Sequence, residues 1–154
     1  MRSRIQTVVL PTEPTEFRDD LRQIFRELDR NDGGDVLTGE CAPALDVYET
    51  DERLEVTMDL PAVAPEAIRV IAKGDTILIV GTKSPRRPRP ESSFHLVERG
   101  YGRFARAVRL MAPCDTSRAS AVLTGGELRV SVPKVVERRG RSRAIAVSTG
   151  QPQA

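Results

Sequence analysis

The stretch ASAVLTGGELRVSVPK, residues 119–134, contains two runs of alternating apolar and polar residues separated by Gly125-Gly126. Alternation with a period of two is typical of strands that bury one face, and paired glycines favour a tight turn because glycine readily adopts positive φ angles. Pro133 ends the second run, since proline cannot donate a backbone hydrogen bond to a neighbouring strand. The stretch therefore predicts an antiparallel β-hairpin.

The same period of two recurs along most of the chain before this hairpin. The pattern predicts further strands that are short, separated by turn residues, and connected without intervening helices. They lie at residues 44–50, 53–61, 94–100 and 102–110, and in a hairpin at residues 68–82 with Lys73-Gly74-Asp75 at its tip. Seven or eight such strands are typical of an all-β protein with an immunoglobulin-like antiparallel β-sandwich.

In the segment before the strands, the apolar residues are spaced with a different period. The apolar residues there are spaced i, i+4, i+7, i+8 and i+11, which places them on one face of an amphipathic helix. A helix of about four turns is marginally stable alone in water, so this apolar face needs a partner. The partner is either the core of the same domain or another protein. The five residues are Phe17, Leu21, Ile24, Phe25 and Leu28.

Two basic segments interrupt or follow the strands. Residues 84–93, SPRRPRPESS, cannot form a central strand because their prolines remove hydrogen-bond donors, so they predict an exposed loop. Residues 135–143, VVERRGRSR, predict a linker. Both segments could attract nucleic acid, but the chain has 24 basic and 22 acidic residues. This balance favours solubilising segments and no nucleic-acid partner.

The sequence offers little for catalysis. His95 is the single histidine, and Cys41 and Cys114 lie outside any metal-binding or redox motif. Motifs for nucleotide binding or hydrolysis are also missing, so we expect no enzyme activity, no metal and no cofactor. No apolar run approaches the ~20 residues of a membrane span, and the N-terminus does not resemble a signal peptide, so we expect a cytoplasmic protein without a membrane span.

Four segments together resemble the small heat-shock proteins of microbes and plants, the family that carries the alpha-crystallin domain. In chain order they are MDLPAVAPEAIRV (58–70), FHLVERGYGRFARAVRL (94–110), ASAVLTGGELRVSVPK (119–134) and Ile145-Ala146-Val147. The last resembles the family's Ile-x-Ile/Val tail motif. Departures from the family pattern are Ala62 for glycine, Val108 for phenylalanine, Gly125 for asparagine and Glu127 for valine.

The resemblance implies three regions and a means of assembly. Residues 1–43 form an N-terminal arm with the helix, residues 44–134 the alpha-crystallin β-sandwich, and residues 135–154 a flexible C-terminal extension. In the family, the tail pair, here Ile145 and Val147, enters a groove on a neighbouring subunit; without such a groove the pair is sequence drift. The groove would be lined by Ile68, Val70, Ala121 and Leu123.

The resemblance also implies a dimer built by strand exchange. The loop after Gly81 would carry a strand to the first strand of the other subunit, residues 44–50. Arg106 corresponds to a family arginine near that interface; otherwise it is a solvated surface residue. The interface residues would be Val47, Phe94, His95, Val97 and Arg106.

The implied function is that of an ATP-independent holdase chaperone, which binds partly unfolded client proteins and prevents their aggregation. Its partners would be these clients and further copies of itself, in dimers and larger homo-oligomers. The client-binding residues would be those of the helix face, Phe17, Leu21, Ile24, Phe25 and Leu28. The alternative is a monomeric co-chaperone or adaptor that resembles the p23-like proteins.

Overall fold

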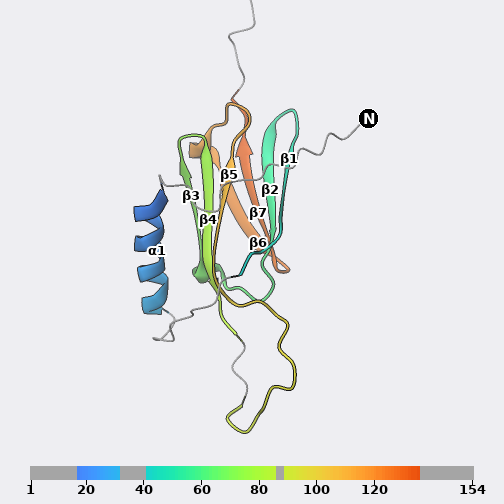
Figure 1. Cartoon of the computed structure of the whole chain (residues 1–154). Helices are drawn as coiled ribbons and strands as arrows, with labels where there is room; N and C mark the ends of the chain where they lie inside the picture. Colours follow the sequence, from blue (N-terminus) through green and yellow to red (C-terminus); the bar gives the residue numbers. More distant parts are fainter. Residues whose placement is uncertain (1–16, 32–40, 86–88, 136–154) are drawn as a thin grey trace, which may run out of the picture.

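The computed structural model describes residues 17–31, 41–85 and 89–135. Within these residues it contains one α-helix, seven strands and two short 3-10 helices, which confirms the predicted fold class (Figure 1). The α-helix is α1 (Arg18–Asn31), and the 3-10 helices are η2 (Pro65–Ala67) and η3 (Thr116–Arg118). The strands are β1 (Leu45–Glu49), β2 (Arg53–Asp59), β3 (Ile68–Lys73), β4 (Thr76–Lys83), β5 (Gly102–Arg109), β6 (Ser120–Thr124) and β7 (Glu127–Pro133).

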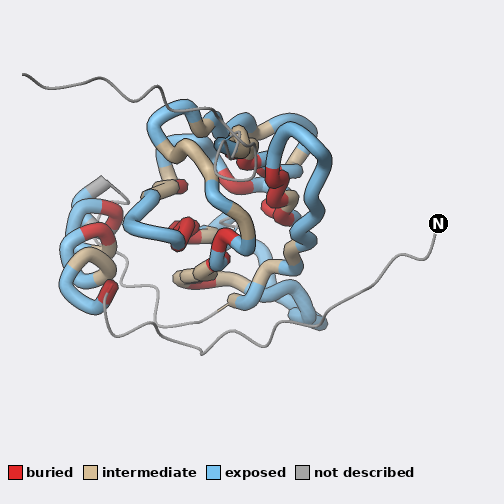
Figure 2. The backbone as a smooth tube through the Cα atoms, turned by 90° about the horizontal axis from the view of Figure 1, so that it is seen from above, coloured by how far each residue is buried: buried red, intermediate tan, exposed pale blue. Residues whose placement is uncertain are grey.

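The strands form two antiparallel sheets that pack face to face. One sheet has the order β1-β2-β7-β6 and the other the order β3-β4-β5. Alternate side chains from both sheets meet in one apolar core. Figure 2 colours the backbone by burial, and the buried positions lie on the inner sides of the sheets and on the side of α1 that faces them. The helix α1 lies outside this sandwich, against the three-stranded sheet (Figure 1).

The hairpin at residues 119–134 forms as its sequence predicts. Strands β6 and β7 pair from Thr124 opposite Glu127 outward, and Gly125 and Gly126 have φ angles of +59° and +82°. Positive φ at both central residues is the geometry of the two-residue turn that matches the twist of paired strands. The backbone N–H of Leu60 donates to the carbonyl of Gly126 at 2.7 Å, which ties this turn to the end of β2.

Gly81 allows β4 to pack closely against its neighbours. It pairs with Phe104 on β5, and an added Cβ would lie 2.4 Å from the Phe104 ring and 2.6 Å from the carbonyl oxygen of Ala67. Real side chains do not approach this closely, so any larger residue at position 81 must displace the ring and the backbone. The glycine therefore makes room for the aromatic ring in the core.

The expectation of a strand at residues 94–100 is wrong for the single chain. Residues 89–101 form a loop that extends beyond one end of the sandwich (Figure 1). A strand forms when its backbone groups pair with a neighbouring strand, and none of the described strands pairs with this segment. Its apolar residues signal strand propensity, but propensity alone does not make a strand.

Candidate interaction surfaces

The helix α1 packs its apolar face against the outer face of the three-stranded sheet. Phe17, Ile24 and Leu28 are 0%, 6% and 4% exposed, and they cluster with Leu78 and Val80 of β4. Leu21 and Phe25 also pack against this cluster, together with Ile71, Ala105 and Ala107. The five residues predicted from the sequence to bind clients are thus brought together, and in this structure they contact their own domain.

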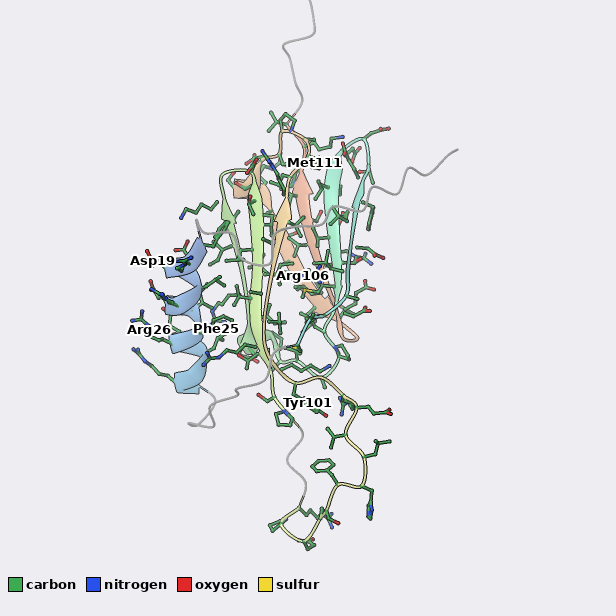
Figure 3. All side chains as sticks on the ribbon, viewed as in Figure 1. Asp19, Phe25, Arg26, Tyr101, Arg106 and Met111 are labelled. Carbon is green, nitrogen blue, oxygen red and sulfur yellow. The ribbon has the colours of Figure 1, made fainter. Side chains whose placement is uncertain are left out.

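Two cations border the contact between α1 and the sheet. Lys73 pairs with Asp20 at 3.3 Å and lies over the ring of Phe17, 5.6 Å from its centroid. Arg103 lies over the ring of Phe25, 5.1 Å from the centroid. Figure 3 shows Phe25 on the side of α1 toward the sheet and Arg26 on the opposite side. These partly exposed contacts orient the helix more than they stabilise it.

The residues under α1 were not among the predicted site residues. Alternation places Leu78 and Val80 on the face of β4 opposite Ile77 and Ile79, yet all four are buried. The available signal was the uninterrupted apolar run at 77–80, because a strand that is apolar on both faces is covered on both faces. We name the residues Ile71, Leu78, Val80, Ala105 and Ala107 the outer apolar face.

Strands β3 and β6 each form one edge of their sheet and carry the residues predicted to accept the tail. Ile68 and Val70 pair with Gly81 and Ile79, and Ala121 and Leu123 pair with Val130 and Leu128. All four therefore occupy inward-facing positions of their strands. Ile68 is buried, Val70 and Leu123 are half-buried against the sandwich core, and Ala121 is exposed.

The tail residues themselves lie outside the described residues. Ile145 and Val147 follow the last described residue, Val135. The place of this tail motif at β3 and β6 therefore stays a prediction.

Strand β1 forms the opposite edge of the four-stranded sheet. It pairs only with β2 among the described strands, and its residues Val47 and Tyr48 are exposed. The loop before β5 is also rich in exposed apolar side chains: Phe94 is 65%, Leu96 72% and Val97 60% exposed. His95 is exposed in the same segment. The structure thus places the residues predicted for the dimer on two surfaces of one chain, an unpaired edge and an apolar loop.

Arg106 connects β5 to the chain that enters β1. Its Nη1 donates to the backbone carbonyl of Pro43 at 2.7 Å, and the residue is half-buried. Arg106 pairs with Ile79, so it occupies an inward-facing position, and Figure 3 places it between the two sheets. This contact differs from a fully solvated arginine and positions the start of the β1 edge.

The two cysteines are poor nucleophiles at neutral pH. Burial raises the pKa of the Cys41 thiol, with Lys83 partly opposing this effect, and the Cys41 Sγ donates to the carbonyl of Gly102 at 3.6 Å. Burial and the nearby Glu49 raise the pKa of Cys114, against the effect of Lys134. The thiolate is the reactive form, so both cysteines are mostly protonated and weakly reactive.

The described part of the chain includes no group of three or more histidine, cysteine or acidic side chains that could hold a metal ion. No helix among residues 17–31, 41–85 and 89–135 is long and apolar enough to cross a membrane.

Comparisons with known proteins agree with this geometry. Residues 46–148 match the model of the Hsp20/alpha crystallin family. The chain is 32% identical over 118 residues to the 16.9 kDa class I heat shock protein 1 of Triticum aestivum, covering 75% of this chain and 78% of that protein. The solved structure of heat shock protein 16.0 from Schizosaccharomyces pombe is similar, with a TM-score of 0.61 and 30% identity over 71% of this chain and all of that one.

A second solved structure supports the fold. A small heat-shock protein from Xylella fastidiosa aligns with a TM-score of 0.59 and 24% identity, over 72% of this chain and 98% of that one. The two-sheet sandwich, the glycine hairpin at residues 125–126 and the matched residues 46–148 show that the chain belongs to the Hsp20/alpha crystallin family, the small heat-shock proteins.

Proposed function

We propose that this protein is an ATP-independent holdase chaperone that captures partly unfolded clients and prevents their aggregation. The observation that carries the proposal is the amount of apolar surface held outside the sandwich core. Among the described residues, the helix α1 is the element that covers the outer apolar face, and its own apolar side packs there. Contiguous apolar surface of this kind marks sites of protein interaction.

Client capture by the apolar side of α1 requires that the helix leave the sheet. Phe17, Ile24 and Leu28 are buried against the outer apolar face and Leu21 and Phe25 are half-buried there, so the whole apolar side becomes accessible after undocking. A 14-residue helix is too short to be stable without tertiary contacts, and local opening of such elements costs less than global unfolding. Release of α1 would therefore expose two apolar surfaces while the sandwich stays folded.

Assembly into dimers would use the loop and the β1 edge. The exposed residues Phe94, His95 and Val97 belong to a segment with strand propensity, and the edge at Val47 has unpaired backbone groups. Addition of the segment to β1 of a second copy would pair both and cover the apolar side chains. Arg106 would stabilise this interface by holding the start of β1 through Pro43.

Larger assemblies would use the tail. Ile145 and Val147 lie one residue apart, so they point to the same side of an extended segment. Bound along β3 and β6 of another subunit, near Val70 and Leu123, they would link dimers. Two anchors make a weak link, which holds when many links act together. We further propose a cytoplasmic location and no enzymatic turnover.

The test measures light scattering of a heat-labile model client with and without this protein. We expect suppression of client aggregation equally with ATP, without ATP and with a non-hydrolysable analogue. A requirement for nucleotide hydrolysis would contradict the proposal. A protein that is strictly monomeric and inactive without a partner chaperone would favour the alternative, a p23-like co-chaperone.

The same preparation tests the dimer. Deletion of residues 84–97 removes the exchanged segment, and we expect a folded protein whose mass in solution is that of a monomer. A matched control replaces Ser92 and Ser93 with alanine, which keeps the length and the apolar residues of the loop. An unchanged dimer mass after the deletion would show that another surface makes the dimer.

A further inference from the structure

The outer apolar face can be recognised only through its side chains. Strand β4 pairs with β5 along its whole length, from Thr76 to Lys83, and with β3 from Thr76 to Gly81, so both sides of β4 are paired across the outer apolar face. Its backbone groups are therefore used within the sheet, and a ligand cannot add to this face as another strand. The edges at β1 and at β3 and β6 differ, because their unpaired backbone groups suit extended segments.

A helix is the ligand that such a face accepts. A helix satisfies its own backbone hydrogen bonds and presents apolar side chains at spacings of three and four residues. The helix α1 demonstrates the fit, since Phe17, Ile24 and Leu28 are buried against Leu78 and Val80. This contact shows both the shape and the spacing that the face accepts.

Two cationic side chains at the border of the outer apolar face add preferences for acidic and aromatic residues in a bound helix. Lys73 contacts Asp20 at 3.3 Å and lies over Phe17, at the N-terminal end of the docked helix. Arg103 lies over Phe25, eight residues further along. A well-matched helix therefore has an aromatic residue at each of these positions and an acidic residue near the first.

We propose that the outer apolar face is a helix-binding site at which α1 competes with amphipathic helices of client proteins. This proposal rests on the holdase function and names a class of client: helical segments with apolar residues at i, i+7 and i+11, an aromatic at i+8 and an acidic residue near the start. Docked α1 keeps the site closed, and its release opens the site. The site is distinct from the strand-binding edges of the same domain.

The test uses a fluorescein-labelled peptide with the sequence of residues 17–31 as the probe and follows its anisotropy. Three forms of the full chain are compared. The first is the unmodified protein. The second carries Phe17→Ser, Ile24→Ser and Leu28→Ser, which weaken docking of α1. In the third, carbodiimide joins the Lys73 amine to the Asp20 carboxylate as an amide, because these groups are 3.3 Å apart; we call it the locked form.

We expect the triple variant to bind the peptide at least tenfold more tightly than the unmodified protein, because its site is no longer occupied by α1. The locked form should bind at least tenfold more weakly than the unmodified protein. Asp20→Asn treated with carbodiimide is the matched control, since it retains the Lys134–Glu49 pair and cannot form the lock. Equal affinity in all three forms would overturn the proposal.

Two further measurements fix the location and separate the two proposals. Ala107→Gln, placed in the triple variant, puts a longer polar side chain on the face and should abolish peptide binding; unchanged binding would overturn the proposal. The client assay is then run on the locked form. Full suppression of aggregation of a helical client by the locked form would overturn the helix-binding site and leave the holdase function intact. Loss of suppression only in the locked form supports both.

Discussion

Strands β2 and β4 both lie inside a sheet, and both bury one face in the same core, but their outer faces differ. The outer face of β2 is polar: Glu55 accepts a hydrogen bond from Ser131 at 3.0 Å, and Arg53 donates to the same hydroxyl at 3.3 Å. The outer face of β4 presents Leu78 and Val80, which are buried under α1.

The two sheets of this domain therefore differ in what their outer faces need in order to be stable. The four-stranded sheet needs no further apolar layer, because its outer face at Arg53, Glu55 and Ser131 is polar. The Oε2 atom of Glu55 is an exception, since it is buried without a hydrogen-bond partner among the described residues. The three-stranded sheet needs a cover, and the cover is a short helix connected through residues 32–40. A contact made by a single helix can open while the sandwich persists. On the proposed function, the apolar surface that captures clients would lie where its exposure costs least.

The sharpest test of the difference compares neighbouring residues of β4. Ile79→Ala removes a fully buried side chain from the sandwich core and should lower the free energy of unfolding by about 2–5 kcal/mol. Leu78→Ala should cost less, about 2 kcal/mol or below, because the loss cannot exceed the free energy that docks α1. Urea unfolding followed by circular dichroism at one fixed protein concentration measures both. Equal losses would mean that α1 and the sandwich unfold as one unit.

The next prediction concerns the inward face of β4 at Gly81. Gly81→Ala places a Cβ within 2.6 Å of both the Phe104 ring and the Ala67 carbonyl oxygen, so we expect a loss of about 1–3 kcal/mol. Gly74→Ala is the control for the removal of a glycine from the same hairpin, because its Cβ would meet nothing within 4 Å and the cost there comes from its φ of +59° alone. A smaller loss at position 81 than at position 74 would contradict the tight packing.

The contrast between the sheets also explains what the sequence could predict. Alternation at residues 53–59 and 127–133 identified β2 and β7, since a strand with one solvent-exposed face alternates apolar and polar residues with a period of two. The helix at residues 18–31 was likewise predicted from its apolar spacing, but spacing alone could not say what covers it. The segment at 94–100 was misassigned because its strand signal is local, whereas strand formation depends on a partner.

The third prediction concerns the turn that connects the two sheets. Ala62 has a φ of +61°, a left-handed conformation that disfavours residues with a Cβ, and it stands where the family commonly has glycine. Ala62→Gly should raise the free energy of unfolding by up to about 1 kcal/mol, since relief of strain exceeds the added entropy of the unfolded chain. The midpoint of urea unfolding measures the change. A decrease in stability would show that the turn holds Ala62 without strain.

The smallest expected effect lies at the tip of the hairpin between β3 and β4. Hydrogen bonds from Thr76 and from Arg109, the latter at 2.9 Å, lower the pKa of Asp75 below its ordinary value of 3.8. Because the folded-state pKa is depressed, the stabilisation is complete above pH ~4 and is lost as the pH falls through the lower folded value. Above pH 5, Asp75→Asn should therefore remove a small, constant contribution to the free energy of unfolding, and the variant should lose less stability than the parent on acidification.

An NMR titration of the Asp75 carboxyl carbon measures its pKa directly. We expect Thr76→Val to raise it more than Arg109→Gln does, since the bond from Thr76 is the larger cause. The reverse order would show that the exposed ion pair with Arg109, rather than the hydroxyl of the buried Thr76, is the larger cause of the lowered pKa of Asp75.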